Sequence, residues 1–293
     1  MRQAGRAVLD DLGGRLGLRS QLERAVEAVM GRHHALQMQE VDALRRELAD
    51  HRAALVEEMA ALRAQTVKEI RRAAEMCTDQ LRGFELRARR DLIFAGEAEA
   101  ARGSADFARR HFAGARSFGQ PRATLEHALS VAPHGGMALE FGVHTGGTLR
   151  VIAEARGGER VYGFDSFGGL PEHWRPGFPA GTFAAPAAPD VPGAEIVPGW
   201  FDDVLPGFLE GHPGPVDFLH VDADLYSSAA SVLHHVGARL RPGSVVVFDE
   251  FFNYPGWQEH EHRAWVEFVD HEQVDFRYEA YTFDNEQVVV VIT

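Results

Sequence analysis

The sequence predicts an α/β protein in which a doubly wound sheet of seven strands, the last one antiparallel, follows a long helical extension. Three observations predict this fold. A buried strand, a glycine-rich turn, a helix and a second strand follow one another over residues 137–165. Strand and helix patterns then alternate to the end of the chain, where a short turn joins two strand patterns. Residues 20–93, in contrast, are rich in Ala, Leu, Glu and Arg and contain no proline, which favours one long helix.

The chain of 293 residues changes in composition near residue 117. All 14 prolines come after that point, and the first is Pro121. Residues 1–116 carry 21 basic and 18 acidic side chains, whereas the remainder carries 9 and 25. We therefore expect a helical extension over residues 1–116 and an α/β domain over residues 117–293. The strong negative charge of the second part disfavours a nucleic acid as its partner.

Targeting signals and membrane spans are not expected. Residues 1–20 lack the apolar core of a signal peptide, and no apolar run approaches the length of a membrane span. The single cysteine, Cys77, cannot form a disulfide within the chain. These observations predict a cytoplasmic protein without a membrane partner.

The long helix carries an incomplete heptad pattern. Apolar residues recur every seven positions at Val41, Leu48, Leu55 and Leu62. Leu44 fills one companion position of the repeat, whereas His51, Glu58 and Gln65 are polar. Two interpretations stay open: a coiled coil that joins copies of the chain into a homo-oligomer, or an amphipathic helix that packs on the main domain. A break is expected over residues 96–103, before further helix at residues 105–115.

The opening unit of the sheet is predicted to bind a nucleotide. Strands are expected at residues 138–141 and 160–164, with a helix at 148–155 between them. Glycines between the first strand and this helix let the backbone approach a ligand closely. Asp165 follows the second strand, where a carboxylate can bind the diol of a ribose.

The residues of the first turn indicate which nucleotide is bound. A dinucleotide fingerprint requires glycine at the position of His144, which disfavours a nicotinamide dehydrogenase. Glu140 would repel a pyrophosphate and attract a cationic amino-acid group. An acidic residue before the glycines and a second one at Asp165 fit S-adenosylmethionine, which carries an ammonium group, a sulfonium and a ribose. A generic turn with incidental carboxylates is the alternative.

The middle of the domain supplies further contacts. Residues 171–192 form a long Pro/Gly/Ala segment, which we interpret as a loop over the active site or, alternatively, as a disordered insertion. After a strand at 194–197, the loop with Gly199, Trp200 and Phe201 is placed to contact the adenine, although Trp200 is equally compatible with a core position. Pro206 is expected to limit the next helix to one or two turns.

Paired acids follow two more strands. Asp222 and Asp224 come after the strand at 216–221, and Asp249 and Glu250 come after the strand at 244–248. Clustered carboxylates repel one another unless a cation lies among them, and oxygen ligands suit Mg²⁺. A catalytic base without a metal is the alternative. The remaining elements are expected to be helices at 120–131, 227–240 and 259–271 and strands at 276–283 and 287–292.

Five motifs together resemble one known family. They are Glu-Phe-Gly-Val-His-Thr-Gly-Gly-Thr from Glu140, Gly-Phe-Asp-Ser-Phe-Gly-Gly-Leu-Pro from Gly163, Pro-Gly-Trp-Phe-Asp-Asp from Pro198, His-Val-Asp-Ala-Asp-Leu-Tyr from His220 and Phe-Asp-Glu-Phe-Phe from Phe248. In this combination, from about residue 120 to the end, the chain resembles the macrocin O-methyltransferase family. This family is a branch of the class I S-adenosylmethionine-dependent methyltransferases, which have a Rossmann-like sheet.

The resemblance implies a cofactor site and a metal site. It places the cofactor on Glu140, Gly142 and Asp165, and a divalent metal on Asp222, Asp249 and Glu250. Glu250 departs from the Asp or Asn of metal-dependent relatives. The complete set of predicted cofactor contacts is Glu140, Gly142, Gly146, Thr148, Asp165, Ser166, Phe167, Gly199, Trp200, Phe201 and Asp222.

The family also implies a reaction, the methylation of a hydroxyl on a small molecule, such as a sugar of a secondary metabolite or a glycan. Mg²⁺ would lower the pKa of the hydroxyl, and Asp222 would take its proton. His144 and His220 are alternative bases. The other class of function is a non-catalytic scaffold that binds S-adenosylmethionine and works through its helical arm.

Overall fold

The computed structural model describes residues 2–293, and it describes side chains from Ser20 onward. The helical extension was predicted to begin at Met1, which lies outside these residues. The chain divides into two compact units, Met1–Glu85 and Leu86–Thr293. The predicted boundary near residue 117 stays a prediction about where the α/β domain begins. Within the part of the chain that is described, no helix is both long and apolar enough to cross a membrane.

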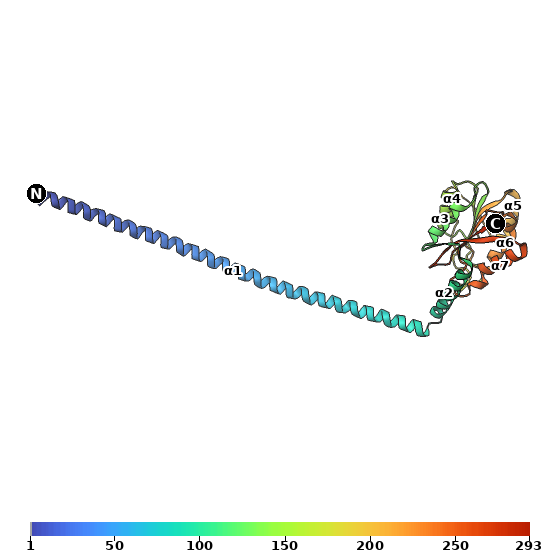
Figure 1. Cartoon of the computed structure of the whole chain (residues 1–293), viewed down its shortest axis with the longest axis horizontal. Coiled ribbons are helices and arrows are strands. Elements are labelled where there is room, and N and C mark those ends of the chain that lie inside the picture. The colour runs from blue at the N-terminus through green and yellow to red at the C-terminus, as the bar shows by residue number, and fades with distance from the viewer. Residues whose placement is uncertain (1) are drawn as a thin grey trace. The chain divides into compact units, whose positions relative to one another are not determined.

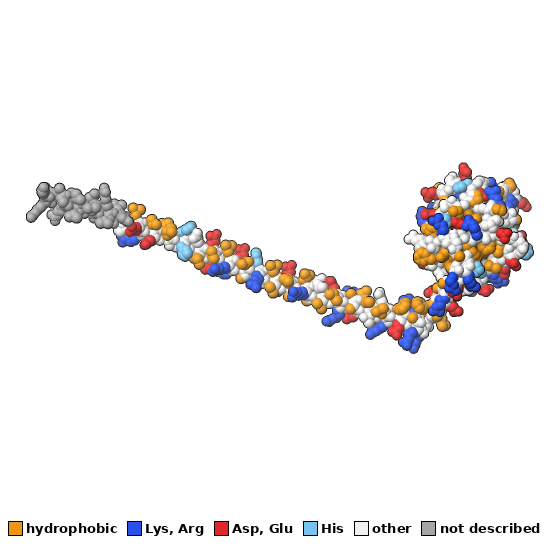
Figure 2. Space-filling model, viewed as in Figure 1, with side chains coloured by type: hydrophobic (Ala, Val, Ile, Leu, Met, Phe, Trp, Pro, Cys, Tyr) orange, Lys and Arg blue, Asp and Glu red, His pale blue; other side chains and the backbone are white. Residues whose placement is uncertain are grey.

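Most of the first unit is one helix, α1, which spans Arg2–Arg90 (Figure 1). The predicted long helix is therefore present. Every side chain described between Ser20 and Arg90 is exposed to solvent. The exposed side chains include many large apolar ones, which are distributed along the helix together with Arg, Asp and Glu (Figure 2).

The predicted break over residues 96–103 is wrong. The break lies at Asp91, whose carboxylate accepts hydrogen bonds from the backbone N–H groups of Ile93 and Phe94 at 3.0 and 3.2 Å. Asp91 thereby caps α2, which spans Leu92–His111 and continues through both glycines of the predicted break. Glycine costs a helix roughly 1 kcal/mol relative to alanine. Burial of α2 side chains such as Phe107 in the core of the second unit offsets that cost.

The second unit contains one mixed sheet with the strand order β1-β7-β8-β6-β5-β2-β3-β4. Its last strand is antiparallel to both neighbours, and the other pairs are parallel, as the sequence predicts for a Rossmann-like sheet. The strands are β1 Arg116–Phe118, β2 Met137–Phe141, β3 Val161–Asp165, β4 Glu195–Pro198, β5 Val216–Val221, β6 Val245–Phe248, β7 Phe276–Thr282 and β8 Val288–Ile292. The sequence predicted seven strands. It missed β1, because three residues are too few to show an alternating pattern.

Helices cover both faces of this sheet (Figure 1). Alternate residues of the strands point to opposite faces, so that Ala138 and Phe218 lie in one core cluster while Phe141 and Leu219 lie in the other. The first cluster includes side chains of α3 and α4, and the second includes side chains of α2, α5, α6 and α7. The helices after α2 are α3 Pro121–Val131, α4 Gly147–Ala155, α5 Phe201–Gly211, α6 Tyr226–Val236 and α7 Glu261–Glu272.

Helix α5 is longer than predicted, because Pro206 lies inside it without ending it. Proline removes one backbone donor, which leaves the carbonyl of Asp202 without its usual helical partner. Both residues are exposed, so water can bind that carbonyl. Leu205 and Phe208 on the buried face hold the helix against the sheet.

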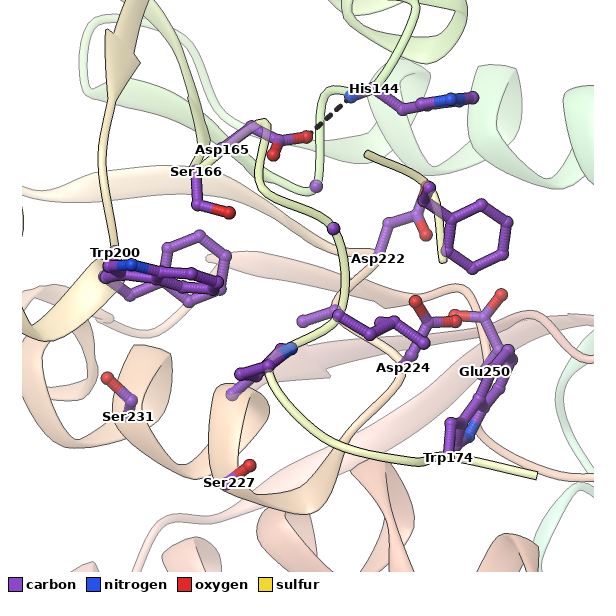
Figure 3. Close-up of a pocket in the computed structure, with 18 of the residues that line it drawn as sticks. His144, Asp165, Ser166, Trp174, Trp200, Asp222, Asp224, Ser227, Ser231 and Glu250 are labelled. Carbon is purple, nitrogen blue, oxygen red and sulfur yellow. Dashed lines mark hydrogen bonds between the residues drawn. The ribbon is translucent and has the colours of Figure 1, made fainter. Parts of the chain in front are cut away.

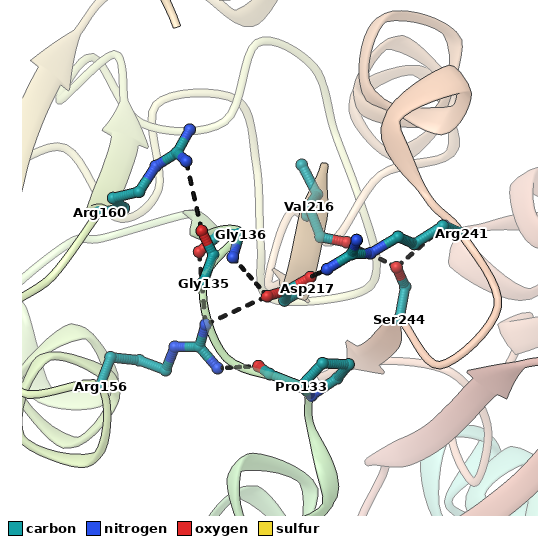
Figure 4. A network of polar contacts seen from close by, with 9 residues as sticks. All are labelled: Pro133, Gly135, Gly136, Arg156, Arg160, Val216, Asp217, Arg241 and Ser244. Carbon is teal, nitrogen blue, oxygen red and sulfur yellow. Dashed lines mark hydrogen bonds and ion pairs between the residues drawn. The ribbon is translucent and has the colours of Figure 1, made fainter. Parts of the chain in front are cut away.

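A buried ionic network fixes the edge of the sheet at which β2 and β5 begin (Figure 4). The fully buried carboxylate of Asp217 accepts hydrogen bonds from the backbone N–H of Gly136 at 2.5 Å and from Arg241 at 2.7 Å. Arg156 lies 3.7 Å from the same carboxylate and also donates to the carbonyl of Pro133. The network therefore joins the turn before β2 to the first residues of β5.

We expect Asp217→Ala to lower the free energy of unfolding of the second unit by about 3–5 kcal/mol, because it leaves Arg156 buried without a counter-charge. All four tryptophans lie in this unit, so urea unfolding followed by tryptophan fluorescence reports on it. Arg241→Ala is the matched control. The Arg241 side chain is 49% exposed, so its loss should cost about 1 kcal/mol. Equal losses in the two variants would contradict this view of the network.

Candidate active site

The loops that follow β2, β3, β5 and β6 meet at the carboxyl edge of the sheet and line a cavity of about 630 Å³ (Figure 3). The long loop after β3 and the first turns of α5 and α6 complete its wall. Cavities of this volume bind cofactors and small molecules. The topology explains the position, because parallel strands bring their carboxyl ends to one edge.

Gly142 allows the loops after β2 and β5 to touch. Its φ of +99° lies in the left-handed region, and a Cβ atom here would lie 1.8 Å from the carbonyl oxygen of Asp222. A residue with a side chain would therefore push the turn after β2 away from the turn after β5. The close approach brings Asp222 to the cavity wall next to the glycine-rich turn.

Asp165 holds the turns after β2 and β3 together. Its carboxylate accepts hydrogen bonds from the backbone N–H groups of His144 and Phe167, each at 2.7 Å. Both donors have positive φ values, 45° and 54°, which non-glycine residues seldom adopt. Each carboxylate oxygen has a second lone pair, so Asp165 can still accept a hydrogen bond from a ligand in the cavity that it lines.

The structure brings together only some of the predicted cofactor contacts. Six of them line the cavity: Gly142, Asp165, Ser166, Trp200, Phe201 and Asp222. Trp200 is 47% exposed, which shows that it is not a core residue. Five do not line it: Glu140, Gly146, Thr148, Phe167 and Gly199. Gly146 instead precedes α4 and lies against Val191. As cofactor contacts, these five residues remain predictions.

Glu140 and His220 form a buried pair beneath the cavity. The Oε1 atom of Glu140 lies 2.9 Å from Nδ1 of His220, and Nε2 of His220 lies 3.8 Å from Asp249. Burial alone would lower the pKa of His220, but its contacts with Asp249 and Glu140 raise that pKa well above the ordinary value. The two acids therefore favour the protonated form of His220. It does not line the cavity, unlike the other alternative base, His144.

The predicted metal ligands converge. Carboxylate oxygens of Asp222, Asp249 and Glu250 lie within 4.8 Å of one another. Burial and the charge of Asp249 raise the pKa values of Asp222 and Glu250 well above the ordinary range. Burial opposes ionisation of Asp249 as well, but the contact with His220 lowers its pKa. The Oε2 atom of Glu250 is buried without a hydrogen-bond partner among the described residues. An all-oxygen set with an unpartnered carboxylate oxygen fits Mg²⁺.

Glu261 is a residue that the sequence analysis missed. It lies at the start of α7, is fully buried, and accepts hydrogen bonds from the backbone N–H groups of Ala223 and Glu250, both at 3.1 Å. One side chain thus joins the two acidic loops. Burial raises its pKa to about 8. A signal was present in the sequence, because an acid three and four residues before Ala264 and Trp265 lies on the apolar face of the helix.

Arg175 is a second missed residue. It comes from the predicted loop over the site, and its guanidinium lies 3.9 Å from the ring centroid of Trp174 and 4.7 Å from that of Tyr254. It also donates to both carboxylate oxygens of Glu286 at 3.0 and 3.1 Å. The loop is thus fastened to the β7–β8 hairpin. Burial raises the pKa of nearby Asp224 to about 7, against the opposing charge of Arg175.

A mixed sheet with an antiparallel last strand and a cavity at its carboxyl edge defines a Rossmann-like nucleotide-binding fold. Residues 139–251 match a family described as "Methyltransferase domain". The resemblance to methyltransferases that the motifs indicate is confirmed for this part of the chain.

Named relatives are similar over part of the chain. A tetracenomycin rhamnosyl 4'-O-methyltransferase from Streptomyces olivaceus is 30% identical over 141 residues, which are 40% of this chain and 53% of the relative. The chain thus spans about half the length of that curated relative. Calicheamicin methyltransferase CalS11 is 23% identical with a TM-score of 0.47, over 58% of this chain and 76% of the other. The O-methyltransferase NovP is 21% identical with a TM-score of 0.44, over 58% of this chain and 78% of NovP.

We expect Glu261→Gln to loosen both acidic loops, because an amide offers one acceptor oxygen where the carboxylate offers two. Hydrogen exchange followed by mass spectrometry should become about tenfold faster or more in peptides covering residues 222–226 and 249–253. Glu272→Gln, at the exposed end of α7, is the control and should leave both peptides unchanged. Unchanged exchange in Glu261→Gln would show that Glu261 does not hold the loops.

Proposed function

We propose that this protein is an S-adenosylmethionine-dependent O-methyltransferase that acts on a hydroxyl of a small molecule, with a divalent metal at its acid cluster. One observation carries the proposal: Asp165, on the nucleotide-binding side, and the acids Asp222 and Glu250 line the same cavity. A methyl donor and a metal-bound hydroxyl would therefore share one enclosed space. A sugar of a secondary metabolite or a glycan is the proposed acceptor, because the curated relative is named as a methyltransferase of a rhamnosyl tetracenomycin.

The cofactor side of the cavity runs from Asp165 and Ser166 to Trp200 (Figure 3). Asp165 would accept hydrogen bonds from the ribose hydroxyls, and the exposed face of Trp200 would lie against the adenine. When bound, S-adenosylmethionine supplies an electrophilic methyl group on its sulfonium. These contacts would orient the donor, and the aromatic side chains of the loop over the site would help to exclude water from it.

Asp222, Asp249 and Glu250 would hold Mg²⁺. The metal would supply a positive charge that lowers the pKa of an acceptor hydroxyl. Asp222 would take the proton of that hydroxyl. Because burial and the charge of Asp249 raise its pKa, its carboxylate is a stronger base than that of an ordinary aspartate. Glu261 and His220 would keep the three ligands in place, Glu261 through backbone amides and His220 through Asp249.

The second candidate is a non-catalytic scaffold that binds S-adenosylmethionine and works through its helical arm. The long, exposed α1 favours it. Methyl transfer from S-adenosylmethionine to a panel of glycosides and nucleotide-linked sugars separates the two candidates, because a scaffold binds the cofactor and transfers nothing. A cytoplasmic location stays a prediction.

We expect Asp165→Ala to weaken the binding of S-adenosylhomocysteine by about 1.5–3 kcal/mol, the contribution of hydrogen bonds to a charged group. Isothermal titration calorimetry measures this loss directly. Asp203→Ala, in the exposed first turn of α5 outside the cavity, is the control and should bind normally. Unchanged affinity in Asp165→Ala would remove Asp165 from the cofactor site.

We expect Mg²⁺ to displace protons when it binds. Burial and the charge of Asp249 raise the pKa values of Asp222 and Glu250 in the absence of a cation, so these groups bind protons more readily than ordinary carboxylates, and a metal that binds there should release protons. Calorimetric titration of Mg²⁺ in two buffers with different ionisation enthalpies measures the proton release. Asp249→Asn should lose most of the metal affinity. A chelator should abolish methyl transfer and leave the affinity for S-adenosylhomocysteine unchanged. Full activity in the presence of a chelator would show that methyl transfer requires no metal.

A further inference from the structure

Helix α1 has an apolar stripe that repeats every eleven residues. The stripe positions start at Leu22 and follow one another in repeating steps of four, three and four residues. Every large apolar side chain at a stripe position is more than half exposed to solvent. These side chains are Leu22, Val26, Val29, Leu44, Leu48, Leu55, Met59, Leu62, Ile70, Leu81 and Phe84. The clearest row is Leu48, Met59, Ile70 and Leu81, each eleven residues after the one before.

The eleven-residue period explains why the heptad pattern is incomplete. Eleven residues over three turns give about 3.67 residues per turn, whereas seven over two give 3.5. Successive members of the heptad series Val41, Leu48, Leu55 and Leu62 therefore lie at different positions around the helix axis and cross the stripe from one side to the other. The next position in the series is the charged Glu69. The second repeat is the weak one. Its three stripe positions hold His33, Gln37 and Glu40, and apolar side chains lie beside them at Leu36 and Val41.

Charged residues of opposite sign border the two sides of the stripe. At about 98° per residue, Glu47, Glu58 and Glu69 lie along one border and Arg52 and Arg63 along the other. Members of each row are eleven residues apart, so the charges keep the period of the apolar positions. A narrow stripe between charged borders is the pattern of a two-stranded coiled coil.

We propose that α1 pairs with α1 of a second copy of this chain, parallel and in register, in a two-stranded coiled coil with a right-handed supercoil. The supercoil follows from the eleven-residue repeat. The partner helix must carry an apolar stripe with the same period and the same interruptions as that of α1 over about 60 residues. A second copy of α1 in register meets this requirement at every position.

The charges determine the direction of pairing. In a parallel pair, the acidic border of one helix faces the basic border of the other, and Glu47 and Glu58 meet Arg52 and Arg63 of the partner, five residues further on. In an antiparallel pair, acidic borders face each other. No oppositely charged residue lies three or four positions from Glu58 or Arg63 in the same helix, so their charges act between helices.

Cys77 provides a test of register. It is exposed, it is the only cysteine, and it lies at a stripe position, 55 residues or five repeats after Leu22. In a parallel pair in register, the two Cys77 residues face each other within disulfide distance. In an antiparallel pair, they lie far apart.

The first experiment oxidises the reduced full-length chain with diamide, which accepts the two electrons and two protons that the thiols lose. We expect most of the protein to run as a covalent dimer on a denaturing gel. The double variant Cys77→Ala, Ala64→Cys moves the thiol to the opposite side of the helix and should stay monomeric on the gel. Absence of a Cys77 crosslink would overturn the parallel register.

The second experiment measures the dissociation constant of the dimer by sedimentation equilibrium under reducing conditions. Glu58→Arg and Arg63→Glu should each weaken dimerisation about tenfold, because two attractions become two repulsions, and the double variant should return to within about twofold of the parent. Leu55→Asp should abolish dimerisation, whereas Ala53→Asp on the outer face should not. A monomeric parent, or tighter association of Glu58→Arg, would overturn the proposal.

Discussion

The crowding of carboxylates at the carboxyl edge of the sheet is the constraint on which the active site depends. Asp222, Asp249 and Glu250 lie close together, and burial together with the charge of Asp249 raises the pKa values of Asp222 and Glu250. Their arrangement persists because the surrounding chain compensates part of the charge. His220 lies beside Asp249, which favours its protonated form, and Glu261 holds the loops through backbone amides. A bound cation would complete the compensation.

The same edge is held together by contacts between loops that are far apart in the sequence. Gly142 permits the turn after β2 to touch the turn after β5, and Asp165 joins the turns after β2 and β3. At the opposite ends of the strands, Asp217 joins the start of β2 to β5. Strands β2 and β5 are thus fixed relative to each other at both ends, which keeps the donor side and the acid cluster of the cavity in a constant geometry.

The long helix and the α/β unit have different physical requirements. The α/β unit buries its apolar side chains in two clusters on either side of the sheet. Helix α1 exposes many of its large apolar side chains along a regular stripe, and pairing with a second helix would remove those of the stripe from water. Pairing through α1 would bring two methyltransferase domains into one molecule, with the association confined to a segment that contributes nothing to the cavity described here.

The sequence alone determined the class of fold, the order of the strands after β1, and the residues at the ends of those strands that line the cavity. Local patterns carry this information: buried runs, glycine turns and acids such as Asp165 and Asp249 directly after strands. The tertiary structure decided what depends on contacts between distant segments. It added β1 and continued α5 through Pro206. It paired Glu140, a predicted cofactor contact, with the buried side chain of His220. It also brought Glu261 and Arg175 to the loops around the cavity. These outcomes could not be predicted, because a side chain's partner is set by which elements meet in space, and spacing along the chain does not record that.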